Sequence, residues 1–101
     1  MSITVQNLSI VIVTLKSENV IFECLDSIDP KIPVFIIENS NNYEFKNLIE
    51  KKYNNVKCTL TYENLGMGSG NNVGIKLVKT EYVLILNPDV ILEHNAIEEL
   101  M

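Results

Sequence analysis

The chain has 101 residues, of which 47% are hydrophobic and 21% charged, and its formal net charge is −5. This length accommodates one domain with a genuine apolar core. An acidic chain without clustered cations argues against binding to duplex nucleic acid and against docking on anionic lipid. Its apolar runs are far shorter than the roughly 20 residues that cross a bilayer, and it begins without the features of a secretory signal. Cys24 and Cys58 lie in apolar patterns and are expected to be buried, reduced thiols, which is typical of a cytoplasmic chain.

Four short runs have the composition of buried β-strands. Leu8–Thr14 is almost continuously apolar and rich in β-branched residues, as in a parallel strand that is buried on both faces. Pro33–Glu38 and Tyr82–Leu86 have the same character, whereas Val56–Tyr62 alternates less clearly. Apolar residues recur at helical spacing between and after these runs. The expected helices are one that Ser17 caps and Asp29-Pro30 ends, one across Phe45–Tyr53, one from about Asn71 to Val78, and a short one with Ile97 and Leu100.

This alternation of strands and helices predicts the fold class. We expect one α/β domain over residues 1–101, with three layers (α/β/α) and a mostly parallel, Rossmann-like sheet of about four strands. Ligands of such sheets bind at the carboxyl ends of the strands, where the strand order reverses. The polar residues that follow each predicted strand are therefore the candidates for a functional site.

Glu38 ends the second predicted strand. Its carboxylate can accept two hydrogen bonds, which suits a ribose diol or the edge of a base. A carboxylate at this position can equally cap the turn or the next helix, and the residue pattern leaves both interpretations open.

Asn87-Pro88-Asp89 follows the fourth predicted strand. A side-chain amide and a carboxylate two residues apart, on a turn stiffened by proline, can hold a hard divalent cation that keeps positions open for phosphate oxygens. Asn-Pro-Asp is also an ordinary turn sequence, so the spacing alone leaves a simple turn as the alternative.

The segment from Gly66 to Asn72 has glycines at i, i+2 and i+4 and looks like a loop that cradles phosphate. A dinucleotide fingerprint would instead follow the first strand, with the spacing G-x-G-x-x-G, so a dinucleotide site is not expected. Gly66 and Gly68 are predicted to lie on the loop, and Gly70 and Gly74 are predicted to let a helix approach the sheet closely.

Taken in chain order, four motifs resemble family 2 glycosyltransferases with the A-type glycosyltransferase fold. They are the strand Ser9–Thr14, the acidic-Asn-Ser turn that ends Val34–Ser40, the Asn-x-Gly segments between Asn64 and Gly74, and the strand before Asn87-Pro88-Asp89, which is similar to an Asp-x-Asp-type metal motif. The Asn-Pro-Asp form is that of rhamnosyltransferase-like members. The resemblance covers roughly Leu8 to Leu100 and identifies the chain as the N-terminal, nucleotide-sugar-binding half of such an enzyme.

The resemblance implies an inverting transfer of a sugar from a nucleoside diphosphate sugar to an acceptor hydroxyl. The residues that it assigns to the nucleotide-sugar site are Thr14 and Glu38 for the nucleoside, Asn64 and Gly66 for its base or ribose, and Asn87 and Asp89 at the diphosphate. Asp89 and Asn87 would bind the cofactor, Mg²⁺ or Mn²⁺, which offsets the charge that develops on the departing diphosphate. The expected acceptor is a glycan or lipid-linked saccharide of the cell envelope, and the expected setting is the cytoplasm or the inner face of its membrane.

The chain departs from the family pattern in three places. Leu15-Lys16 stands where Tyr-Asn is usual, Glu38 replaces an aspartate, and Asn87 replaces the first acid of the metal motif. These differences leave the base preference and the dependence on metal open.

The family's acceptor cleft and catalytic base belong to a second half that has no counterpart here. We therefore expect a truncated domain that is inactive alone, and we assign no catalytic residue. The alternative is a non-catalytic, oligomeric interaction module that retains the fold, and a different doubly wound enzyme is a third possibility. Tyr82–Leu86 is expected at an exposed sheet edge, which favours a homo-oligomer.

Overall fold

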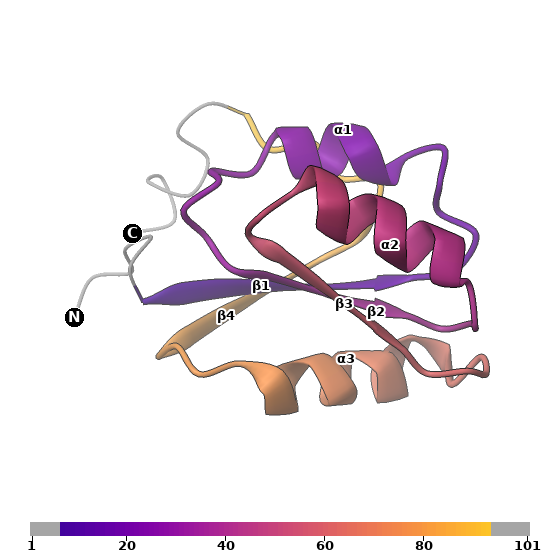
Figure 1. Ribbon diagram of the computed structural model, residues 1–101. Coiled ribbons are helices and arrows are strands. Elements are labelled where there is room, and N and C mark those ends of the chain that lie inside the picture. The colour runs from indigo at the N-terminus through magenta and orange to yellow at the C-terminus, as the bar shows by residue number, and fades with distance from the viewer. Residues whose placement is uncertain (1–6, 94–101) are drawn as a thin grey trace.

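The computed structural model describes residues 7–93 of the chain (Figure 1). Strands and helices alternate in the order β1 (Leu8–Thr14), α1 (Ile21–Asp26), β2 (Val34–Glu38), α2 (Tyr43–Lys52), β3 (Val56–Leu60), α3 (Gly66–Leu77) and β4 (Tyr82–Leu86). All four predicted strands are confirmed. The short helix expected around Ile97 and Leu100 lies outside the described residues.

The four strands form one parallel sheet in the order β3-β2-β1-β4. The register pairs Thr14 of β1 with Glu38 of β2, and Ile12 of β1 with Leu86 of β4. Because β1 and β2 are central, while β3 and β4 are the edges within residues 7–93, the strand order reverses at β1. The sheet therefore has its topological switch point between β1 and β4.

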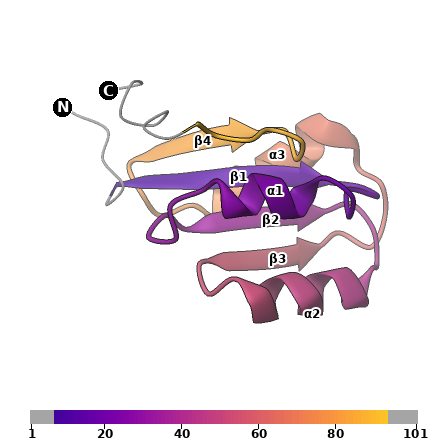
Figure 2. The same ribbon diagram turned by 90° about the horizontal axis from the view of Figure 1, so that it is seen from above.

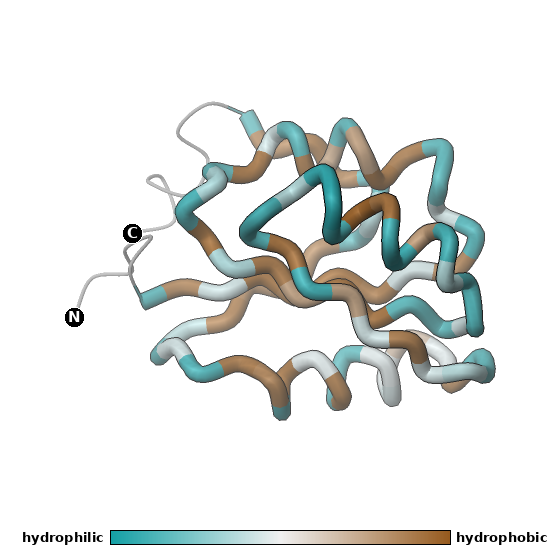
Figure 3. The backbone as a smooth tube through the Cα atoms, viewed as in Figure 1, coloured by the Kyte–Doolittle hydropathy of each residue, from teal (hydrophilic) through white to brown (hydrophobic). Residues whose placement is uncertain are grey.

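Helices cover both faces of this sheet, which confirms the predicted three-layer α/β fold. Helices α1 and α2 lie above it and α3 lies below it in Figure 1, and Figure 2 shows the same strands from above. Every residue of β1 is buried, in agreement with its continuous apolar sequence. The tube of Figure 3 shows hydrophobic colours along the strands in the middle of the sheet.

Helix α3 begins five residues earlier than predicted, at Gly66 instead of about Asn71. The prediction that Gly66 and Gly68 lie on a loop is therefore wrong. Glycines disfavour a helix by about 1 kcal/mol each, but tertiary contact outweighs this preference here. A Cβ atom on Gly70 would lie 2.8 Å from Val13 Cγ1, so α3 packs on β1 at a distance that only glycine allows.

Helix α1 is also shorter at its start than predicted. It begins at Ile21, after Val20, and no side chain caps it. The hydroxyl of Ser17 instead exchanges hydrogen bonds with the backbone of Leu15, at 3.2 and 3.3 Å, so the predicted Ser17 cap is wrong. Within residues 7–93, every helix is too short or too polar to cross a membrane.

Candidate nucleotide-sugar site

The carboxyl ends of the four strands lie along one rim of the sheet. Tyr62 and Asn64 follow β3, Glu38 ends β2, Thr14 ends β1, and the Asn87–Asp89 turn follows β4. The parallel pairing therefore brings every predicted site residue to the same edge. Strands β2 and β4 flank β1, so their ends are separated by two strand spacings, or roughly 10 Å.

Thr14 and Glu38 form a buried pair at the centre of the rim. The Thr14 hydroxyl donates to Glu38 Oε1 at 2.6 Å, and the Ser40 hydroxyl donates to Glu38 Oε2. Only 1% of Glu38 is exposed, and Thr14 is completely buried. Each carboxylate oxygen retains a second lone pair, so a nucleoside hydroxyl would have to enter beside these partners. The assignment of Thr14 and Glu38 to the nucleoside stays a prediction.

Asn39, which sequence reasoning did not include among the site residues, connects β2 to the loop after β3 and to α3. Its side-chain amide donates to the carbonyl oxygen of Gly66 at 3.0 Å, and its Oδ1 accepts from the Thr61 hydroxyl at 3.0 Å. The side chain is buried. The only signal for it in the sequence was its place next to Glu38 in the acidic-Asn-Ser turn.

Asn64 and Gly66 form a tight turn at the start of α3. Asn64 Oδ1 accepts from the Gly66 amide at 3.0 Å, and Gly66 has a φ of +82°, a conformation that favours glycine. Both residues are exposed at the rim. This geometry leaves them accessible for the base or ribose role that the sequence predicts, which no contact here tests.

Asn87 and Asp89 are exposed on a turn that the backbone closes through a Val90 amide to Asn87 carbonyl bond of 3.2 Å. The chain then folds back over α1, where the Leu92 amide donates to Ser27 Oγ at 2.9 Å. Burial, together with the negative charge of Asp89, raises the pKa of the Cys24 thiol to about 11.

The donor set of this turn fits a cation that is shared with a ligand. Among residues 7–93, no three His, Cys, Asp or Glu side chains gather into a group that could hold a metal ion. Asn87 and Asp89 supply one amide oxygen and one carboxylate, and Mg²⁺ is commonly held by one or two carboxylates with phosphates and waters completing its shell. The residues thus suit Mg²⁺ or Mn²⁺ bound together with a diphosphate, and they do not form an all-protein cage.

Two exposed tyrosines stand at the β3 end of the rim. The hydroxyl oxygens of Tyr43 and Tyr62 are 2.7 Å apart, and their ring centroids are 6.2 Å apart at an interplanar angle of 58°. This hydrogen bond raises the pKa of Tyr62. Sequence reasoning missed the pair because the two residues are 19 positions apart and belong to different elements.

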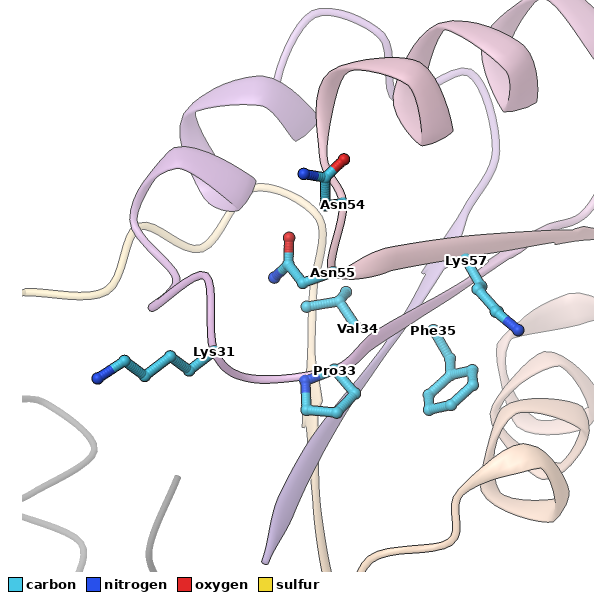
Figure 4. Close-up of a pocket in the computed structure, with 7 residues that line it drawn as sticks. All are labelled: Lys31, Pro33, Val34, Phe35, Asn54, Asn55 and Lys57. Carbon is cyan, nitrogen blue, oxygen red and sulfur yellow. The ribbon is translucent and has the colours of Figure 1, made fainter. Parts of the chain in front are cut away.

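A cavity of about 320 Å³ lies at the opposite, amino-terminal edge of the sheet. Figure 4 shows Pro33, Val34 and Phe35 on its floor, with the amino groups of Lys31 and Lys57 pointing away from each other. Its polar side chains do not converge on a common point, so this cavity is not the candidate site.

Comparisons with known proteins agree with this arrangement. The profile of glycosyl transferase family 2 matches residues 9–101, whereas no curated protein matches the chain. Among solved structures, S. aureus TarS 1–349 has a TM-score of 0.80 at 23% identity, over 93% of this chain and 31% of that chain. This level of identity shows a shared fold.

Two further TarS structures are similar. TarS 1–349 in complex with UDP has a TM-score of 0.71 at 25% identity, over 82% of this chain and 27% of that chain. A longer TarS chain has a TM-score of 0.70 at 25% identity, over 82% of this chain and 16% of that chain. The chain thus spans less than a third of the solved structures that it matches. From the family profile, which covers nearly all of the sequence, the chain belongs to glycosyl transferase family 2.

Proposed function

We propose that this chain binds a nucleoside diphosphate sugar, as the N-terminal, donor-binding part of a family 2 glycosyltransferase. The observation that carries the proposal is the family match over residues 9–101 on a sheet whose rim gathers Thr14, Glu38 and the Asn87–Asp89 turn. TarS, which shares the fold, was solved in complex with UDP, and this supports a nucleotide as the ligand.

The proposed division of labour follows the order of the strands along the rim. Thr14, Glu38, Asn64 and Gly66 bind the nucleoside, while Asn87 and Asp89 hold Mg²⁺ or Mn²⁺ beside the diphosphate. When bound, the cation neutralises charge on the leaving diphosphate. The chain's own contribution is to orient the donor, because the buried Thr14–Glu38 hydrogen bond of 2.6 Å fixes the floor of the site.

The finer proposal is an inverting hexosyl or rhamnosyl transfer to a hydroxyl of a cell-envelope glycan or lipid-linked saccharide, at the cytoplasmic side of the membrane. Transfer also needs a general base. TarS is about three times as long as the part that this chain matches, and we propose that acceptor binding and the base belong to such additional sequence. These 101 residues are then expected to bind donor without transferring its sugar.

The second candidate function is a non-catalytic module that associates with itself through β4. Within residues 7–93, β4 forms one edge of the sheet, and its Val83 and Ile85 side chains are 37% and 43% exposed. An apolar edge strand without proline is a template for pairing with another strand. Analytical ultracentrifugation tests this: we expect a dimer or larger species that Ile85→Lys dissociates, and a monodisperse monomer at high concentration would contradict it.

Thermal shift measurements test the donor proposal. UDP, GDP and dTDP are added to the folded chain in turn, each with and without Mn²⁺. We expect at least one nucleotide to raise the melting temperature, and to raise it more with Mn²⁺. If the folded protein responds to none of them, nucleotide binding is refuted and only the family relationship remains.

A further inference from the structure

The Tyr43–Tyr62 pair has a backbone geometry that an ordinary surface tyrosine lacks. Tyr62 has a φ of +68°, a left-handed conformation that is uncommon for bulky residues. Its amide donates to the Ser40 carbonyl oxygen at 3.0 Å, and the Ser40 hydroxyl in turn bonds the Glu38 carboxylate. Strained residues of this kind persist where the surrounding structure holds them, and they cluster at functional sites. The amide contact with Ser40 therefore places the backbone of Tyr62 beside the turn that follows Glu38 at the rim.

Both rings remain largely open to solvent in this position. Tyr62 is 61% exposed and Tyr43 is 53% exposed, although each offers an apolar face that would gain from burial. Their hydroxyl groups are paired with each other at 2.7 Å, so the two rings are held as one unit. The unit joins the first residue of α2 to the loop after β3. Because the two ring planes are inclined at 58°, a planar ligand would stack on one ring at a time.

The place of the pair along the rim suggests which part of a ligand it meets. The oxygen ligands of the Asn87–Asp89 turn lie at the β4 end, and the pair lies beyond β2 at the β3 end. These ends are three strand spacings apart, or roughly 14 Å. A nucleoside diphosphate whose diphosphate lies at the β4 end extends its ribose over Glu38 and its base towards the β3 end.

We propose that the Tyr43–Tyr62 pair is the stacking platform for the nucleobase of the donor, with Tyr62 as the main contact. This inference rests on the proposed donor function. Aromatic side chains stack on bases whatever their identity, since every base has a π-face. Asn64 and the backbone of the loop after β3 would then be left to discriminate one base from another.

Calorimetric titration distinguishes the contribution of the Tyr62 ring to binding from that of its hydroxyl group. It also distinguishes the contribution of the base from that of the rest of the nucleotide. The ligands are UDP, GDP and dTDP, of which the tightest is used for the variants, and ribose 5-diphosphate, which carries its diphosphate on C5 of the sugar as a nucleotide does but has no base. Tyr62→Ala is expected to weaken nucleotide binding by roughly ten-fold, within the range measured for base stacking on aromatic residues, and to leave binding of the base-free probe unchanged. Tyr62→Phe keeps the ring and is expected to bind nucleotide as the parent does.

Leu48→Ala is the matched control, because Leu48 is also on α2 and is as exposed as Tyr43, at 53%. It is expected to change neither titration. The platform is refuted if Tyr62→Ala binds nucleotide normally, if it weakens the base-free probe as much as the nucleotide, or if Tyr62→Phe is as weak as Tyr62→Ala. If the parent chain binds no nucleoside diphosphate at all, the donor proposal itself fails, which is a different result from normal binding by Tyr62→Ala.

Discussion

Replacing Gly74 with alanine tests the close packing of α3 on the sheet. A Cβ atom at this position would lie inside 3.0 Å of Val11 Cγ1, 3.1 Å from Val11 Cγ2 and 3.3 Å from Ile37 Cγ1. Carbon atoms pack best at about 3.5–4.0 Å, and both neighbours are completely buried in the sheet. The new methyl group can therefore be accommodated only by moving α3 or by distorting β1.

The net effect is the difference between two terms. Overpacking a well-filled core costs about 1–3 kcal/mol, and the severity of the overlap with Val11 favours the upper end. The gain in helix propensity from glycine to alanine returns about 1 kcal/mol. Gly74→Ala is therefore expected to lower the free energy of unfolding by about 2 kcal/mol, which corresponds to a fall in Tm of roughly 8–16 °C for a domain of this size.

Gly68→Ala is the internal control for this experiment. Gly68 lies in the same helix, and a Cβ there would meet nothing within 4 Å, so the propensity gain stands alone and stability should rise by about 0.5–1 kcal/mol. Urea unfolding measures the free energy of unfolding of three variants. They are Gly74→Ala, Gly68→Ala and the double variant that combines Val11→Ala with Gly74→Ala. The packing argument is refuted if Gly74→Ala is as stable as the parent. It is also refuted if Gly74→Ala lowers the free energy of unfolding as much when Val11 is replaced by alanine as when Val11 is present.

Three further predictions concern the site and the core. Asp89→Ala is expected to abolish the part of any nucleotide-induced thermal shift that depends on Mn²⁺. The protein without ligand should melt normally, because Asp89 is exposed. If Mn²⁺ still increases the thermal shift as it does in the parent, Asp89 is not part of the cation site. Thr14→Val removes the hydroxyl that donates to buried Glu38, and should destabilise the fold by about 1–3 kcal/mol in urea unfolding, whereas Thr59→Val at a half-buried position of β3 should have little effect. Burial raises the pKa of Cys24 to about 11 and that of Cys58 to about 12, while the unfolded chain releases these thiol protons near 8.5. The folded state therefore holds more protons than the unfolded chain between about pH 8.5 and these pKa values, and the free energy of unfolding should fall as the pH rises through this range. In Cys58→Ala this fall should be shallower. Equal slopes of stability against pH in the parent and the variant would contradict the assignment of the fall to the buried thiols.

The strands were predictable because runs of apolar, β-branched residues are visible directly in the composition, although β1 is buried along its whole length whereas Val83 and Ile85 of β4 are exposed. Leu8–Thr14 and Tyr82–Leu86 are continuous apolar runs, and their bounds in the structure are those predicted. The start of α3 was not predictable, because Gly66, Gly68 and Gly70 have low helix propensity, and the helix is supported there by contacts of Gly66 and Gly70 with distant residues. One such contact is the Asn39 amide on the Gly66 carbonyl, which joins positions 27 residues apart.

The candidate site was predictable in its residue types but not in its bonding. Motif order placed Thr14 and Glu38 at strand ends, yet their hydrogen bond depends on the β1–β2 register, which no local pattern specifies. The sequence also did not indicate that the hydroxyl groups of Thr14 and Ser40 donate to the Glu38 carboxylate, and the role of Glu38 in ligand binding stays a prediction. Tyr62 could not be found at all, because its left-handed backbone has no signature in a bulky residue.

The turn that carries Asn87 and Asp89 is anchored at both of its ends. Before it, β4 is hydrogen-bonded to β1, and after it, Leu92 is bonded to Ser27 while Val90 and Leu92 pack on the core. A loop restrained in this way has already lost much of its conformational entropy during folding, so a ligand that binds there has less disorder to remove. The cation site proposed here has only two protein oxygen ligands, and its binding free energy would be reduced little by the cost of ordering the loop.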